Sequence, residues 1–348
     1  MTTATTTPAR YAPSALNRLF SAVERLPGGG WWIYPLSFLA LIVYHHAALW
    51  IIGSVPVGSP SLAGVPALAF GPYALGVSHL FIRIAGRSME AFRPASGLSD
   101  ADYSGRRFEL LTVPPGRLWL PFLVGAIVAV GSILSASPSA IAAYGVTRGS
   151  ALLVFGPAAL FGYGMAGVSV YFSARILQQV DRLHREATAI DLFDTAPIYA
   201  FSALTVRLGI AYVLGGYYAL FVNSAFQAGN ILSLASIAIT VALGVACFVV
   251  PLWGIHGRLA AAKAVLVRGS SLRDQALEAE LFRRVDAGNL AGVKEVADAL
   301  SGIRATSDRI AKLPTWPWPP QVLRGFISAI LLPVAVFLIT RYVGSQIN

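Results

Sequence analysis

Charged side chains are scarce in this sequence. Only 12% of its 348 residues are Asp, Glu, Lys or Arg, whereas 56% are hydrophobic; a soluble domain carries roughly 25% charged residues. The mean hydropathy is +0.66, and several apolar runs reach the ~18–20 residues that a helix needs to cross a bilayer. This composition argues against a soluble domain and predicts an all-α, polytopic membrane helical bundle.

Cysteine is almost absent as well. The single Cys247 lies within an apolar run, so it can form no internal disulfide and cannot build a thiolate metal site alone. The sequence also lacks a G-x-x-x-x-G-K-[ST] phosphate loop and an H-E-x-x-H zinc motif. We therefore expect no catalytic residue, no metal, no cofactor and no nucleic-acid partner, and we expect that the protein is not an enzyme.

Seven apolar runs predict seven membrane spans. They lie near residues 33–53, 64–83, 118–137, 151–173, 205–226, 231–253 and 322–341. Pro66, Gly71 and Pro72 interrupt the second run, so we expect a kinked or re-entrant segment there. Three glycines in the fourth run, Gly162, Gly164 and Gly167, favour close helix contacts.

The distribution of charge predicts the orientation. Of the 26 Lys and Arg residues, only Arg148 and Arg341 fall on one side of the seven spans, and all 16 acidic residues fall on the other side. Because basic residues accumulate on the cytoplasmic side, the N-terminus should lie inside and the C-terminus outside. Only three of the basic residues are Lys, which is typical of GC-rich prokaryotic genomes and indicates a multi-pass protein of a prokaryotic plasma (inner) membrane.

The chain divides into four parts by composition. Residues 1–30 are an N-terminal cytoplasmic segment, in which Leu16, Leu19, Val23 and Leu26 form the stripe of an interfacial amphipathic helix. Residues 31–254 hold spans one to six. Residues 255–313 predict a cytoplasmic helical hairpin, broken at 269–271, where a capping box is expected to start a new helix. Residues 314–348 hold a Trp- and Pro-rich segment and span seven.

The second helix of this hairpin carries a heptad seam. Its positions follow spacings of three and four residues: the apolar Val293, Val296, Leu300, Ile303 and Ile310, with Ser307 between the last two. About two and a half repeats are too few for an independent coiled coil. The seam therefore needs a partner, which is either its own hairpin mate or the same helix of neighbouring subunits.

Between the hairpin and span seven the sequence reads LPTWPWPP, residues 313–320, which we call the collar. Trp316 and Trp318 suit a membrane interface, while Pro317 and Pro319 prevent one helix from continuing into the next. A stiff strut of this kind transmits displacement better than a glycine linker would. The collar is thus either a coupling element between the hairpin and span seven or a static interfacial anchor.

Histidines are the notable polar residues within the runs. His45 and His46 lie near the middle of span one, and His79 lies in the second run; polar groups at that depth are functional candidates. The alternatives are hydrogen bonds between helices, to one another or to a Tyr hydroxyl, ligation of haem or metal, and a role in pH sensing or permeation. His184 and His256 should lie on the cytoplasmic side in solvent.

Acidic residues are missing from all seven runs. Proton- or sodium-coupled carriers usually place a carboxylate there, so coupled transport is disfavoured. Asn223 and Gln227, with several tyrosines, gather toward the outer end of span five. They either line an outward-facing cavity or mark the membrane interface.

Two stretches resemble an uncharacterised family of prokaryotic multi-span membrane proteins. They are FRPASGLSDADYSGRRFELLTVP (92–114), and PLWGIHGRLAAAK (251–263) followed by PTWPWPPQVLR. That resemblance covers most of the chain and implies no activity. In topology alone, the layout is similar to that of insect odorant and gustatory receptor channels, in which a cytoplasmic helix leads into a pore-forming seventh span. This similarity implies that span seven lines an axis.

These observations lead to two hypotheses from different classes. The first is a homo-oligomeric protein of ion-channel-like or sensory type, with span seven at the axis. The alternative is a non-catalytic scaffold or accessory subunit of a larger membrane complex, or a transporter. The expected partners are the lipid bilayer, other copies of the chain, and a cytoplasmic or membrane protein.

Overall fold

The computed structural model describes residues 11–142, 144–188, 191–222, 231–289, 291–331 and 335. Within these ranges the chain is helical and contains no strand. The longer helices are α1 (Ala15–Glu24), α2 (Ile33–Ile51), α3 (Phe70–Ser96), α4 (Asp100–Leu111), α5 (Trp119–Ser135), α7 (Arg148–Glu186), α8 (Ser202–Val222), α10 (Ile231–Asp286) and α11 (Val293–Ala311). The short helix α6 spans Pro138–Ala142, and the last described helix is Pro320–Leu331.

Among the described residues, five helical segments are long and apolar enough to cross a membrane: Ile33–Ile51, Pro66–Ser96, Arg148–Glu186, Ile198–Tyr218 and Ala242–Asp286. The helices Trp119–Ser135 and Pro320–Leu331 are apolar but shorter. The prediction of an all-helical protein with several membrane-spanning helices is therefore confirmed.

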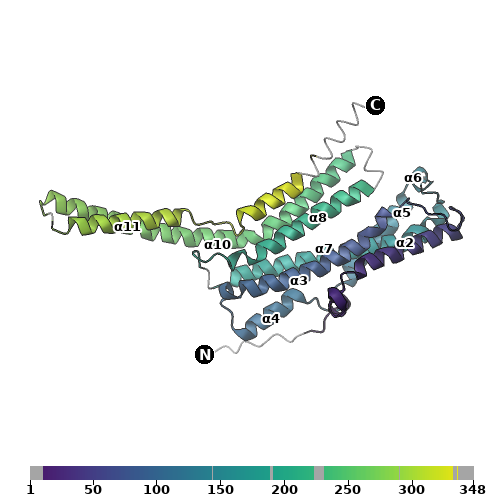
Figure 1. Ribbon diagram of the computed structural model, residues 1–348, viewed down its shortest axis with the longest axis horizontal. Coiled ribbons are helices and arrows are strands. Elements are labelled where there is room, and N and C mark those ends of the chain that lie inside the picture. Colours follow the sequence, from purple (N-terminus) through teal and green to yellow (C-terminus); the bar gives the residue numbers. More distant parts are fainter. Residues whose placement is uncertain are drawn as a thin grey trace, which may run out of the picture.

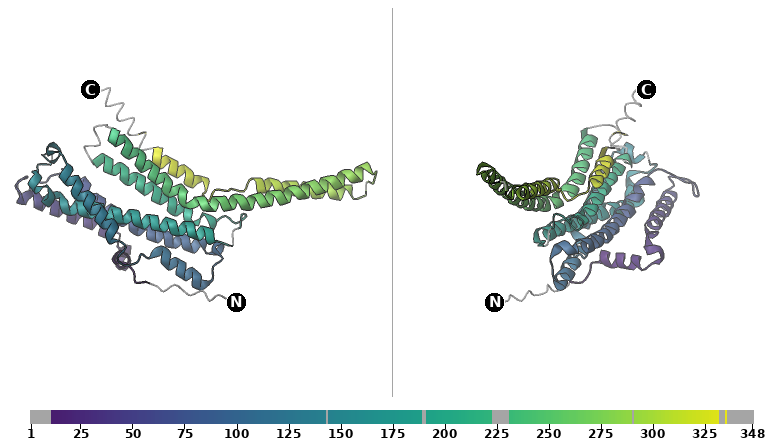
Figure 2. Two further views of the ribbon diagram at one scale, coloured as in Figure 1. Left: turned by 180° about the vertical axis from the view of Figure 1, so that it is seen from behind. Right: turned by 60° about the vertical axis from the view of Figure 1, so that its left-hand side comes forward.

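The helices form a bundle with a projecting arm (Figure 1). Within the bundle, α7 packs against α3 and α5, and α10 packs against α7 and α8. The part of α10 beyond Gly257 leaves the bundle with α11 antiparallel beside it, and both views of Figure 2 show this long two-helix arm standing clear. We call these residues, 257–311, the arm.

The second apolar run is a helix, contrary to the predicted interruption. A short 3-10 turn at Pro66–Ala69 leads directly into α3, which continues for 27 residues. Gly71 and Pro72 lie in the first turn of α3, where a proline removes no helical hydrogen bond because the amides of that turn have no partner within the helix. Gly71 and Pro72 therefore do not break α3, and the irregular part of this run is the 3-10 turn at Pro66–Ala69.

The break predicted at residues 269–271 is also wrong, because α10 runs without interruption for 56 residues. A single helical glycine costs only ~1 kcal/mol relative to Ala, and the capping-type side chains make tertiary contacts instead. The Ser270 hydroxyl bonds the Ser307 hydroxyl at 2.5 Å, and Asp274 accepts from Arg304 at 3.1 Å. The hairpin turns after Asp286, where Gly288 has φ 65°.

The N-terminal helix α1 packs on the bundle through a face that differs from the predicted stripe. Leu16, Phe20 and Val23 are buried, but Leu19 is 44% exposed. The reason is Asn17, whose side chain donates to the Leu111 carbonyl and accepts from the Val113 amide, each at 2.9 Å. These bonds rotate α1 so that Asn17 faces inward.

Tyr11 fixes the chain that leads into α1. Burial raises the pKa of its phenol, so the hydroxyl stays protonated and donates to the Thr112 carbonyl at 2.7 Å. The Arg175 guanidinium donates to the same hydroxyl at 2.8 Å. The N-terminal segment is therefore tied to α7 as well as to the residues that follow α4.

Candidate functional site

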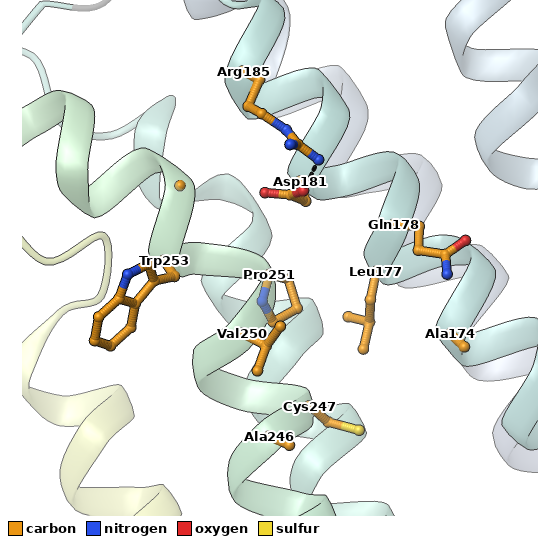
Figure 3. A pocket seen from close by; sticks show the side chains of 11 residues that line it. Ala174, Leu177, Gln178, Asp181, Arg185, Ala246, Cys247, Val250, Pro251 and Trp253 are labelled. Atoms are coloured by element: carbon orange, nitrogen blue, oxygen red, sulfur yellow. Dashed lines mark hydrogen bonds and ion pairs between the residues drawn. The ribbon is translucent and has the colours of Figure 1, made fainter.

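A groove of about 600 Å³ lies between α7 and α10, where the arm leaves the bundle (Figure 3). Its α7 side is formed by Ala174, Leu177, Gln178, Asp181 and Arg185, and its α10 side by Ala246, Cys247, Val250, Pro251, Trp253 and Gly254. The apolar residues occupy the end toward the bundle interior. The charged pair occupies the end toward the arm.

Two residues of α10 explain why the groove forms there. Pro251 lies inside the helix and has no amide hydrogen, so the carbonyl of Cys247 loses its helical donor. Gly254 lets the backbone approach α7 closely, because a Cβ at this position would meet Asp181 Oδ1 at 3.0 Å. The groove thus combines Cys247 of α10 with the Asp181 carboxylate of α7.

At the charged end of the groove, Asp181 and Arg185 form an ion pair within one turn of α7. The Arg185 guanidinium donates to the Asp181 carboxylate, and the two side chains are 68% and 27% exposed. From the other wall, Arg258 donates to the carbonyls of His184 and Ala187 at 2.5 and 2.6 Å. These bonds satisfy the last carbonyls of α7 and hold the base of the arm against the bundle.

His184 does not lie in solvent, so that expectation is wrong. Its side chain is fully buried, and its ring meets Phe92 and Phe201 edge to face at 5.4 Å. Its Nδ1 lies 3.5 Å from the Pro251 carbonyl, and its Nε2 has no hydrogen-bond partner in the described part of the chain.

The collar lies flat along α10. The ring of Trp316 stacks on His256 at 3.8 Å and on Trp318 at 4.4 Å. Trp318 then meets Phe248 at 4.9 Å, and Phe248 meets Phe326 of the last helix at 4.4 Å. A continuous row of aromatic rings therefore connects the base of the arm with the last helix.

Hydrogen bonds hold the collar in this place. His256, expected in solvent, is only partly exposed and its Nδ1 bonds the Thr315 carbonyl at 2.9 Å. Lys263 donates to the Ala311 and Leu313 carbonyls at 2.7 and 2.8 Å. Pro317 is buried and Pro319 is half-buried. The collar tryptophans thus face their own chain.

One residue of the groove contacts the collar. Trp253 forms the rim of the groove, and its ring meets Trp316 at 5.6 Å. In Figure 3 the indole projects from α10 on the side away from α7. A change in the groove can thus reach the collar through a single side chain.

The heptad seam faces α10 within the same chain. Leu300 and Ile310 are buried, and Val293, Val296 and Ile303 are half-buried, while their neighbours along α11 are exposed. Arg304 adds contacts from α11 to Asp274 and Glu278 of α10. The intrachain partner, one of the two alternatives, thus covers the seam.

His79 is an enclosed polar residue of the second run, with 1% exposure. Its Nδ1 bonds the Tyr34 hydroxyl at 2.6 Å, and its Nε2 lies 3.3 Å from Glu24 Oε1. The ring is stacked between Phe20 at 4.8 Å and Trp31 at 5.0 Å. It therefore joins α1, α2 and α3, and the Tyr hydroxyl is the kind of partner predicted from the sequence.

His45 and His46 do not meet His79. Their Nε2 atoms bond backbone groups of the loop after α2, the Ala63 carbonyl and the Ser61 amide, each at 3.1 Å. Both histidines thus hold this loop over the bundle. Asn223 and Gln227, predicted near an outer cavity or interface, lie outside the described residues.

Among the described residues, no group of three or more His, Cys, Asp or Glu side chains could hold a metal ion. Neither a protein-family model, nor a curated protein, nor a solved structure matches this chain.

The sequence analysis missed the groove. Asp181 and Arg185 have the (i, i+4) spacing of a helix surface pair, and Pro251 and Gly254 stand three residues apart in PLWG. Each signal is common by itself. Only the packing of α7 on α10 brings them together.

Proposed function

We propose that this protein is a non-catalytic, ion-channel-like or sensory membrane protein in which displacement of the arm controls the last helix. In this proposal it lies in a prokaryotic inner membrane with seven spans, N-terminus inside and C-terminus outside. The arm then lies in the cytoplasm, and several copies assemble with the seventh span at the axis.

The aromatic row from His256 to Phe326 is the observation that carries this proposal. Because α10 is one helix from the bundle to the arm tip, tilting the arm would displace His256, and Pro251, which lies between His256 and Phe248, is the point at which the helix would bend. Trp316 stacks on His256, Trp318 meets Phe248, and Phe326 packs on Phe248. Motion of the arm would reach the last helix without passing through a flexible linker.

The seven-span topology is supported by the five long helices and the two shorter ones. The shorter helix Trp119–Ser135 contacts α7 along its length through close glycine contacts, including Gly125 against the Tyr163 carbonyl. The distribution of Lys and Arg supports the orientation.

Reconstitution in liposomes tests the proposal. Purified protein should form an oligomer of defined mass in nanodiscs and should pass monovalent ions in a flux assay. A strict monomer would remove the axis, and absence of flux in every ionic condition would contradict a channel.

A scaffold or accessory subunit is the second candidate, and one observation favours it. The outer side of the arm exposes large apolar residues: Val265 is 71% exposed, Leu272 62% and Phe282 58%. Such residues can dock a partner protein. Stoichiometric co-purification of one protein from the native host, lost on Leu272→Glu and Phe282→Glu substitution, would support this candidate over the first.

A further inference from the structure

The groove between α7 and α10 combines an apolar interior with a charge pair at one end. We propose that it is a specific site for one phospholipid with a zwitterionic headgroup that carries N–H donors, of the phosphoethanolamine class. The inference rests on the membrane placement given in the proposed function, and it supplies a ligand for the residue that adjoins the collar.

The size and polarity of the groove suit an amphiphile. A volume of about 600 Å³ lies within the ~300–1,000 Å³ range of small-molecule sites. Ala174, Leu177, Ala246 and Val250 supply the apolar part, where the first segments of acyl chains would lie. Val250 is 65% exposed, so the groove opens sideways and the rest of the chains can continue into the bilayer.

The ion pair selects the headgroup. Asp181 directs its Oδ1 toward Gly254, while its Oδ2 accepts from Arg185. An ammonium group can therefore donate to Oδ1, and a phosphate can accept from the remaining N–H groups of Arg185. Both hydrogen bonds are charge-assisted, the stronger kind. A phosphocholine group offers no N–H to Asp181, and a phosphoglycerol group brings no positive charge.

The neighbouring Arg182 is exposed but does not line the groove, and two further charges at this end are engaged elsewhere. Arg258 donates to main-chain carbonyls of residues 184, 185 and 187. Glu186 pairs with Arg106 at 2.9 Å on a different face. Asp181 and Arg185 therefore present one carboxylate beside one guanidinium, which matches a zwitterion better than an anion.

Lipid binding in the groove would affect the collar. A headgroup seated against Gly254 would contact the helix turn that carries Trp253, and Trp253 meets the collar at Trp316. Occupancy would therefore bias the position of the collar. The lipid composition of the membrane would thereby influence the position of the last helix.

Native mass spectrometry of the full chain in detergent tests the site. Phosphatidylethanolamine, phosphatidylcholine and phosphatidylglycerol with identical acyl chains are added in equal amounts. We expect the first adduct to be phosphatidylethanolamine, retained about tenfold better than either competitor, as one added charge-assisted hydrogen bond predicts. Asp181→Asn should reduce this preference to less than about twofold, since the amide cannot balance the ammonium charge.

Two glycines supply a matched pair of variants on the same helix. A Cβ at Gly254 would press on Asp181 Oδ1, whereas one at Gly257 would have nothing within 4 Å. Gly254→Ala should weaken retention of phosphatidylethanolamine and Gly257→Ala should not. Equal retention of the three lipids, a preference for phosphatidylglycerol, or an unchanged preference in Asp181→Asn would overturn the proposal. Lipid retention is measured without ion flux. A failure of the lipid-site proposal can therefore be distinguished from a failure of the proposed channel function.

Discussion

At the scale of residues, close approach of helices depends on particular glycines. A Cβ at Gly125 of α5 would lie 2.1 Å from the Tyr163 carbonyl, and one at Gly167 of α7 would lie 2.2 Å from the Pro121 carbonyl. Both obstacles are main-chain atoms, which cannot rotate away. The sequence predicted small-residue contacts at Gly162, Gly164 and Gly167, but it could not say which helix they face.

Gly125→Ala should therefore separate α5 from α7 and lower stability by ~2–3 kcal/mol. Gly131→Ala on the same helix is the control, because a Cβ there meets nothing within 4 Å and Ala is the better helix former by ~1 kcal/mol. Thermal unfolding in detergent should place Gly125→Ala below the unmodified chain and Gly131→Ala at or above it. Equal stability of the two variants would refute the close α5–α7 contact.

The buried His79 gives a second prediction. Tyr34→Phe removes the hydroxyl bonded to His79 Nδ1 and leaves a buried nitrogen without its partner, which costs ~1–3 kcal/mol. Ser37→Ala, on the same helix, removes only a local bond to the Tyr34 carbonyl and should have a smaller effect. Limited proteolysis near α1 and thermal unfolding would measure the stability of both variants. If Tyr34→Phe proves no more labile than Ser37→Ala, His79 does not hold α1 to the bundle.

At the scale of elements, the apolar runs predicted the helices of the bundle but not where they end. Span two was expected to stop near residue 83, yet α3 continues to Ser96 because Phe92 and Ala95 are buried against other helices. The continuous α10 was missed because Ser270 and Asp274 have capping side chains whose partners, Ser307 and Arg304, lie more than 25 residues away in sequence. Contacts of that kind override local signals.

The α11 seam is tested by a charge at its centre. Leu300→Asp would place a carboxylate against α10 and should cost several kcal/mol in the stability of the arm. Ala299→Asp, at an exposed neighbouring position, introduces the same charge and should be nearly neutral. Hydrogen exchange of the arm amides would detect the difference.

Measuring the mass of the assembly for the same two variants distinguishes the two alternative partners of the seam, which are α10 of the same chain and α11 of a neighbouring subunit. If α11 packs only on α10, Leu300→Asp should leave the mass of the assembly unchanged. A smaller assembly for Leu300→Asp, with Ala299→Asp unaffected, would show that the seam also holds subunits together.

At the scale of the whole molecule, the proposed topology places the arm and the C-terminus on opposite sides of the membrane. A cysteine introduced at Ala287, in the turn at the arm tip, should react with an impermeant maleimide only in inverted vesicles, and one added after Asn348 only in intact cells. Cys247 is buried and would be replaced by Ala for this assay. Labelling of both sites from the same side would mean that the last helix does not cross the membrane.

The central claim is that the collar transmits motion of the arm to the last helix. Pro317→Ala and Pro319→Ala together keep Trp316 and Trp318 but make the link flexible, while Pro138→Ala makes the same change at an exposed distant site. Ion flux in liposomes, measured for the unmodified chain, the double variant and Pro138→Ala, is the most direct test. We expect a clear change in flux for the double variant alone; equal flux in all three proteins would show that the collar does not transmit the motion.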